Sequence, residues 1–299
     1  MSSPTEIDPF LPIELERIIF QLCAQSLPVF TPQLMLVARR VKEWVEPFLY
    51  RVICIGLDSA APGFPLFTPD TFTCMMTRKS PKFLRSAVRH FMVEDGSEYP
   101  VRELLNICTE IEDLWLPLQD GSYVPIIQVL PLRRLGIDFR QFLRLPLTCR
   151  ALSGLTHLAF TDSLTETPGE YDAACAAFLA LPKLTHLSFD GGIHSQFIRE
   201  RIGQILESLP SLHVVVAFAY HIFDFTGNRR IATTDPRFVA FLRPDFSLDW
   251  HAGARGGADY WTDAENSVAK RRAGESDFFH FLCNSWLSWC STMCTSVND

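Results

Sequence analysis

An apolar-x-x-apolar-x-apolar pattern recurs along the middle of this 299-residue chain, and it constrains the fold more than any other feature. Two copies, Leu152–Phe160 and Leu181–Phe189, share the sequence Leu-Thr-His-Leu. The pattern begins at Val88, Ile111, Leu132, Leu155, Leu184 and Leu212. Successive starts lie 23, 21, 23, 29 and 28 residues apart. Such a period predicts one supersecondary unit per repeat, with the units stacked side by side.

The pattern is that of the strand segment of a leucine-rich repeat, whose period is about 20 to 29 residues. Helical patterns lie between the strand segments, at 101–108, 123–130, 172–181 and 195–208. Repeated right-handed crossovers predict parallel strands, with the helices on the convex outside. The Asn or Cys that usually follows each strand is missing, so the repeats are irregular; the residues there are Gly96, Gln119, Arg140, Ser163, Gly192 and Tyr220.

The third, fifth and seventh positions of each repeat alternate with the apolar ones, so they should face the concave side. Parallel strands about 4.8 Å apart would stack these side chains in rows. A mixed polar surface with an exposed Trp and an Arg is typical of protein recognition. We therefore predict a target-binding surface formed by Trp115, Arg134, Asp138, His157, His186 and Asp190.

Two histidines on adjacent strands, His157 and His186, raise the question of a metal site. Two imidazoles need a third ligand and supporting hydrogen bonds, which Asp190 or Asp162 could supply. An open concave face would instead leave both rings solvated, and such histidines are far more common than metal ligands. We therefore expect solvated histidines, with no metal or other cofactor.

The N-terminal region has the pattern of three short helices. Apolar residues recur at helical spacing from Leu15 to Cys23, Thr31-Pro32 is a typical helix start, and a third apolar face runs from Val41 to Leu49. A unit of about forty residues cannot hide its whole apolar face, and an exposed apolar patch marks a partner.

These helices carry the motifs Leu11-Pro-Ile-Glu-Leu15, Ile18-Ile19, and Leu36-Val-Ala-Arg-Arg-Val41 with Trp44. Together these residues resemble an F-box, the motif that docks onto the Skp-type adaptor of cullin-based ubiquitin ligases. The run from Leu34 to Ile53 is similar to F-box-like domains of a large fungal family, in which irregular leucine-rich repeats follow. The resemblance implies adaptor contacts by Leu11, Pro12, Ile19, Leu36, Val37 and Trp44.

These residues could instead pack the three helices against one another. For Leu15, Ile18 and Leu34 we expect such internal packing, whereas Leu11 and Pro12, at a helix start, should form the interface. If the helices merely capped the repeats, Leu11, Pro12, Leu36 and Val37 would be buried against them.

The chain divides into five segments by these criteria. They are a polar lead (1–10), the F-box-like unit (11–50), the repeat solenoid (51–220), a C-terminal capping region (221–275) and an aromatic tail (276–299). A docking peptide, a membrane-touching segment and a disordered tail without function all stay open for the last.

Three local elements complete these expectations. Leu49–Gly56 predicts a strand at the N-terminal edge of the sheet. We expect a helix near Asp235–Leu242 and a final helix over Asp259–Arg272 that closes the open end of the array.

Composition excludes several classes of function. A net charge of −7 offers no electrostatic surface for nucleic acid or anionic lipid. Nine cysteines without a Cys-x-x-Cys pair indicate buried thiols in a reducing compartment. No secretory signal and no apolar run of about 18 residues is seen, so we expect a cytoplasmic or nuclear protein without membrane contact.

Motifs of catalysis are also missing: the sequence has neither a Gly-x-Ser-x-Gly elbow nor a phosphate loop. We therefore expect a non-enzymatic receptor that links an unknown target protein to a ubiquitin ligase. The alternative is a repeat scaffold with no ligase attached. A metal-dependent hydrolase using His157 and His186 is a remote third possibility.

Overall fold

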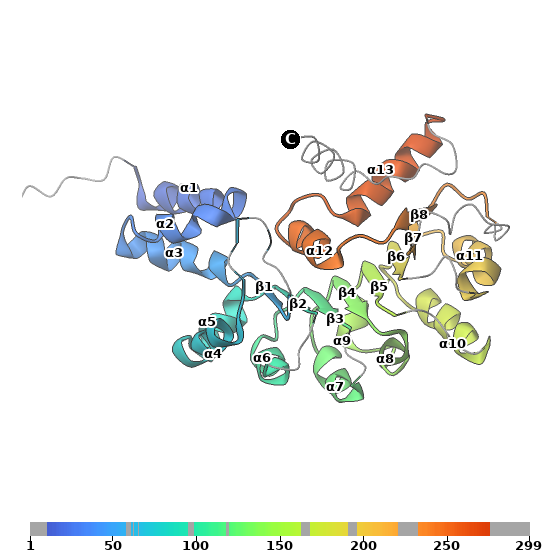
Figure 1. The fold of residues 1–299 in the computed structure, drawn as a ribbon, viewed down its shortest axis with the longest axis horizontal. Helices are drawn as coiled ribbons and strands as arrows, with labels where there is room; N and C mark the ends of the chain where they lie inside the picture. The colour runs from blue at the N-terminus through green and yellow to red at the C-terminus, as the bar shows by residue number, and fades with distance from the viewer. Residues whose placement is uncertain are drawn as a thin grey trace, which may run out of the picture.

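A single curved sheet of eight parallel strands organises the computed structural model (Figure 1). The model describes residues 11–57, 61, 63–64, 66–94, 99–117, 120–162, 168–190, 196–220 and 233–275. Strand order follows chain order. The strands are β1 (Val52–Ile55), β2 (His90–Val93), β3 (Asp113–Leu116), β4 (Arg134–Ile137), β5 (His157–Phe160), β6 (His186–Phe189), β7 (Val214–Ala219) and β8 (Phe238–Leu242). The predicted α/β class and parallel strands are confirmed.

The register of the sheet follows the repeat frame. Each strand from β2 to β7 begins two residues after the start of one copy of the apolar pattern. The third residue of each repeat therefore pairs with the third residue of the neighbouring repeat. His157 pairs with Arg134 on one side and with His186 on the other. His186 in turn pairs with Val214. The predicted concave rows are therefore the rows that the sheet forms.

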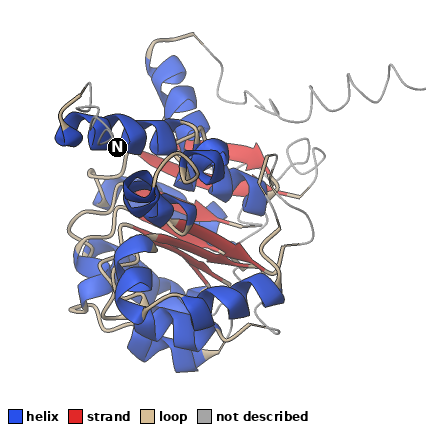
Figure 2. Ribbon diagram, turned by 90° about the vertical axis from the view of Figure 1, so that its left-hand side faces the viewer, coloured by secondary structure: helices blue, strands red, loops and turns tan. Residues whose placement is uncertain are grey.

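Helices cover the convex side of the sheet, one or two between successive strands from β1 to β7 (Figures 1 and 2). They are α4 (Pro69–Arg78), α5 (Pro81–Ala87), α6 (Val101–Ile107), α7 (Val124–Ile127) after the 3₁₀ turn η2 (Gly121–Tyr123), α8 (Phe139–Leu143), α9 (Arg150–Ser153), α10 (Pro168–Leu179) and α11 (Gln196–Ser208). All four predicted inter-strand helices are present, although the one at 123–130 is a single short turn.

The main core lies between the sheet and these convex helices. The first, fourth and sixth residues of all six frames are buried in it, as in Leu155, Leu158 and Phe160. Phe160 stacks on Phe189 of the next strand at 5.4 Å between ring centroids. Burial of this repeated apolar set stabilises the fold at roughly 25 cal/mol per Å².

The N-terminal helices form a separate small cluster beside β1 (Figure 1). They are α1 (Ile13–Ser26), the 3₁₀ turn η1 (Pro28–Phe30), α2 (Thr31–Leu34) and α3 (Arg39–Leu49). Only Ala24, Val41 and Val45 are fully buried apolar residues there. An ion pair of 2.8 Å between Lys79 Nζ and the Glu46 carboxylate joins α3 to the repeat region.

The expected helix near Asp235–Leu242 is wrong, because Phe238–Leu242 is the edge strand β8. Five consecutive residues of β8 pair with β7, starting with Val215 opposite Phe238. Phe and Val favour extended backbone when a neighbouring strand is available to pair with. The short apolar run was ambiguous between helix and strand, and pairing with β7 decided it.

Two C-terminal helices, α12 (Phe246–Ala254) and α13 (Tyr260–Arg272), lie on the concave side of the sheet (Figure 1). The predicted final helix over 259–272 is therefore confirmed to within one residue. The helix contacts the last two strands, β7 and β8, as a cap at that end would, and its N-cap residue Asp259 also reaches β4 across the concave face. None of the helices in the described ranges is long and apolar enough to cross a bilayer.

Candidate functional site

The concave rows of the repeat sheet contact α12 and α13 rather than solvent. Trp250 of α12 donates its indole N–H to the buried carboxylate of Asp113 at 3.0 Å. Further along, Ser188 and Tyr260 share a hydrogen bond of 3.0 Å between their hydroxyl groups. We call α12 and α13 together the concave cap.

Arg134 joins the middle of the sheet to the cap. Its Nη1 donates to Oδ2 of Asp259 at 2.8 Å, and Asp259 is almost fully buried. The other oxygen of Asp259 accepts from the main-chain N–H of Thr262, so this carboxylate is also the N-cap of α13. One carboxylate thus starts α13 and fixes it to β4.

Trp115 is a second contact between sheet and cap. Its ring lies 5.3 Å from that of Phe246, and the residue is buried. Space for the indole comes from Gly136 on the neighbouring strand, because a Cβ atom there would lie 2.3 Å from Cε3 of Trp115. Because Gly136 has no side chain, the indole of Trp115 in the preceding repeat fits beside it.

His157 and His186 lie under Trp261 of the cap. Their rings stack with centroids 3.9 Å apart, and Trp261 meets both edge-on at 5.3 and 5.4 Å. Burial, followed by the charge on His186, lowers the pKa of His157 to about 2. Burial also lowers the pKa of His186, although the carboxylate of Glu265 opposes this. The expectation of solvated histidines on an open face is therefore wrong.

The two carboxylates of the predicted target-binding set are buried as well. Oδ1 of Asp138 accepts from the main-chain N–H of Gln141 at 3.1 Å and caps helix α8. Asp190 accepts from Nε of Arg243 at 3.0 Å. Both residues are only 4% exposed.

The structure therefore brings Trp115, Arg134, His157 and His186 to one face and covers that face with the chain's own C-terminal helices, whereas Asp138 caps α8 and Asp190 pairs with Arg243. The open recognition surface that we expected from the repeats is not what the structure has. Target contact by these residues stays a prediction, and it requires the concave cap to move.

The opposite situation holds on the N-terminal helices, where large apolar side chains face solvent. Leu36 is 85% exposed, Val37 61%, Ile19 47% and Leu11 39%, and Pro12 is exposed as well. Eleven of the sixteen exposed large hydrophobic residues in the described ranges lie between Leu11 and Val37. We call these eleven the apolar surface: Leu11, Ile13, Leu15, Ile18, Ile19, Leu22, Leu27, Val29, Phe30, Leu36 and Val37.

The amphipathic pattern of α1 was correct, but its apolar side is not the internal side. We expected Leu15 and Ile18 to pack against the other helices, and both are about half exposed instead. Leu34 does pack on the small helical core, as expected, and so does Trp44, which we had assigned to the adaptor contact. Trp44 is thus partly buried, whereas the other five adaptor positions are open.

The cap residues that hold the concave face escaped the sequence analysis. Trp250, Tyr260 and Trp261 lie at least 135 residues along the chain from Trp115, the β3 residue that shares their cluster. The only local signal was the Asp259 N-cap before an aromatic pair, and it indicates a helix without indicating where that helix docks.

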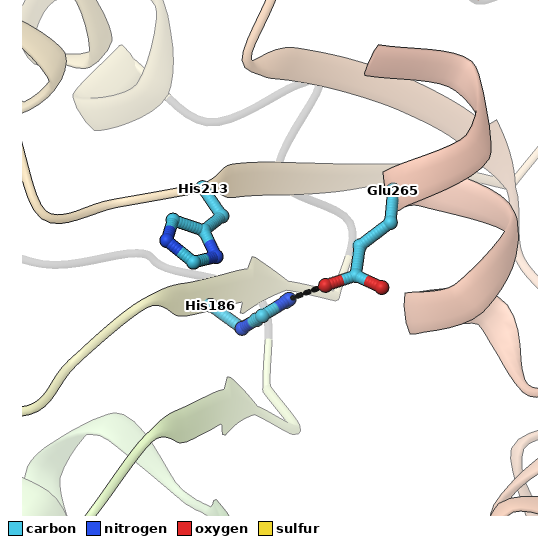
Figure 3. A group of neighbouring side chains, drawn as sticks. All are labelled: His186, His213 and Glu265. Atoms are coloured by element: carbon cyan, nitrogen blue, oxygen red, sulfur yellow. Dashed lines mark hydrogen bonds and ion pairs between the residues drawn. The ribbon is translucent and has the colours of Figure 1, made fainter. Parts of the chain in front are cut away.

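A further group of side chains could hold a metal ion. His186, His213 and Glu265 point toward one another from the sheet and from α13 (Figure 3). One ligand atom from each lies within 4.8 Å of the others, and the described ranges contain no second group of this kind. His213 was not among the residues that the sequence analysis selected.

Neither a protein-family model nor a curated protein matches the chain.

Proposed function

We propose that the chain is an F-box-like substrate receptor that acts in the cytoplasm or nucleus. Its N-terminal helices would bind a Skp-type adaptor, and its repeat region would hold a target protein for ubiquitin transfer by other subunits. The receptor performs no bond chemistry itself. It raises the effective concentration of the target beside the enzyme that modifies it.

The observation that carries this proposal is the exposure of the apolar surface. Apolar patches of this kind on a soluble protein mark sites where another surface binds. The side chains at the start of α1 and in the loop before α3 are the positions that the F-box resemblance assigns to the adaptor. An adaptor with an apolar groove would remove them from water, with a gain of roughly 25 cal/mol per Å².

The alternative is a repeat scaffold with no ligase attached. That hypothesis expects Leu11, Pro12, Leu36 and Val37 to be buried against the first repeats. All four are exposed, which favours the receptor.

Two routes to a target follow from the covered concave face. In one route the concave cap lifts and the target contacts Arg134, His157 and His186. In the other the cap stays closed and its outer surface, together with the rim of the repeats, binds the target. Cross-linking of α13 to the sheet, for example through a cysteine pair, would block the first route and spare the second.

The adaptor proposal is tested with purified full-length protein and a purified Skp-type adaptor. We expect a one-to-one complex with micromolar or tighter affinity. Leu36→Asp with Val37→Asp should weaken it at least tenfold, because central apolar contacts typically contribute about 2 kcal/mol or more. Leu11→Asp with Pro12→Ala should act in the same direction.

The matched control is Leu179→Asp on α10, because Leu179 is a similarly exposed leucine on the repeat region. This variant should bind the adaptor like the original protein. A folded protein that ignores the adaptor at micromolar concentration, or one that Leu179→Asp weakens as much as the double variant does, would overturn the proposal.

A further inference from the structure

We propose that His186, His213 and Glu265 bind one divalent transition-metal ion of the zinc class, which fastens α13 to the repeat sheet. The three residues come from the start of β6, from the residue before β7 and from the middle of α13. This proposal is independent of adaptor binding.

The geometry places two imidazoles and one carboxylate around a common point (Figure 3). Nε2 of His186 lies 2.9 Å from Oε1 of Glu265, and the ring of His213 stands 5.8 Å from that of His186 at 72°. In a tetrahedral zinc site, with bonds of about 2.0–2.2 Å, ligand atoms lie roughly 3.4 Å apart. In the structure the ligand atoms of the three residues lie within 4.8 Å of one another. Rotation of the two exposed side chains, His213 and Glu265, would bring these atoms to the separation that zinc needs.

The hydrogen bonds behind His186 suit a metal ligand. Nδ1 of His186 lies 2.8 Å from Oγ1 of Thr185, and that hydroxyl donates to the carbonyl oxygen of Thr156 at 3.2 Å. When that hydroxyl donates to the carbonyl, it accepts from the ring and the proton of His186 sits on Nδ1. The lone pair of Nε2 is then directed at the Glu265 carboxylate. In this tautomer a proton or a metal ion would bridge the two acceptors 2.9 Å apart, and this orientation of the ring is the one that metal-binding histidines adopt.

The preceding repeat shows what the site needs beyond this hydrogen bond. Thr156 and His157 repeat the same arrangement, with 2.8 Å between Oγ1 and Nδ1. Trp261 covers the His157 ring, and no carboxylate in the described ranges is hydrogen-bonded to it. Of the two Thr-His repeats, only the second has a carboxylate hydrogen-bonded to its histidine in the described ranges.

Two neutral imidazoles and a carboxylate form a ligand set that zinc binds in proteins, with water in the fourth position. Because His213 and Glu265 are exposed, an ion can enter from solvent without opening the cap. Binding would replace any proton between His186 and Glu265 and release it to water. The ion would tie one side of α13 to two strands and oppose lifting of the concave cap.

The test uses full-length protein freed of metal by a chelator and then titrated with Zn²⁺ in a calorimeter. We expect one ion per chain and micromolar affinity. Co²⁺ should give the visible absorption of a four-coordinate N and O site. Zn²⁺ should also raise the midpoint of thermal unfolding, because it binds the folded state only.

Variants at the exposed ligands keep the test independent of folding. His213→Ala and Glu265→Gln should each weaken Zn²⁺ binding at least tenfold, and Thr185→Val should weaken it about 10- to 100-fold. His90→Gln is the control, because His90 also faces a carboxylate, Asp113, across 3.5 Å but has no second imidazole there. It should bind Zn²⁺ like the original protein. Undetectable binding at millimolar Zn²⁺, or unchanged binding in the double variant His213→Ala/Glu265→Gln, would overturn the proposal.

Discussion

The apolar surface of the N-terminal helices and the polar concave face of the repeats differ in a way that reverses the usual expectation. Apolar side chains of α1 and of the loop before α3 lie in solvent, whereas Arg134, His186 and Asp190 lie under other parts of the chain. Polar residues placed on a predicted binding face are here engaged in internal contacts. The exposed residues of the apolar surface are leucines, isoleucines, valines and one phenylalanine.

The comparison teaches that residue type alone does not identify a docking surface. The polar concave rows make specific hydrogen bonds to the cap, so their polar groups are satisfied within the chain. Each residue of the apolar surface is at least 39% exposed, and contact with water is unfavourable for these apolar side chains. An exposed apolar side chain therefore indicates a partner-binding site better than a polar side chain on a predicted binding face does.

The largest expected effect comes from removing the central aromatic residue of the cap. Trp261→Ala should lower the free energy of unfolding by about 3–5 kcal/mol, because it leaves a cavity over the two stacked histidines. Leu36→Ala, at an 85% exposed residue, should change it by less than about 0.5 kcal/mol. Chemical denaturation of both variants measures the contrast. Similar losses in the two would remove the distinction between the covered and the open region.

A smaller loss of stability is expected from a substitution at the contact between the β3 and β4 repeats under the cap. Gly136→Ala should lower the free energy of unfolding by about 1–3 kcal/mol, because its Cβ would overlap the Trp115 ring. Gly203→Ala on α11 is the matched control, since nothing lies within 4 Å of its added Cβ. It should be neutral or stabilising. A neutral Gly136→Ala would mean that Trp115 can leave the sheet at little cost.

The smallest expected effect depends on pH. Burial raises the pKa of Asp249 in α12 to about 7, against a hydrogen bond from the Tyr260 main-chain N–H that lowers it. The folded state therefore holds this proton more strongly than the unfolded state, and the resulting stabilisation is lost as the pH rises from about 4 through 7.

Asp249→Asn removes this titration. The free energy of unfolding of the variant, relative to the original protein, should thus increase by about 1–2 kcal/mol between pH 5 and pH 8. Denaturation at several pH values measures it. A difference that does not change with pH would mean that Asp249 is better solvated than its place in the cap indicates.

The repeat frame, the strand register and the convex helices could be predicted because they follow from local periodicity. Each strand has the same alternation, and the positions of Leu155, Leu158 and Phe160 recur in every frame. The cap could not be predicted in this way. The Ser247 hydroxyl donates to Glu94 across 153 residues, and no periodic pattern encodes such a pairing. The side of α1 that faces solvent was also beyond prediction, because an amphipathic pattern does not say what covers it.

The concave cap also constrains how the protein forms during synthesis. Strand β2 and the residues after it leave the ribosome long before the helices that will cover them, and 153 residues separate Glu94 from its partner Ser247. At about 5–20 residues per second, this interval lasts roughly 8–30 s. During that time Trp115 and its neighbours are exposed to solvent on an incomplete sheet. The nascent chain, unlike the folded protein, would therefore be a candidate for binding by chaperones.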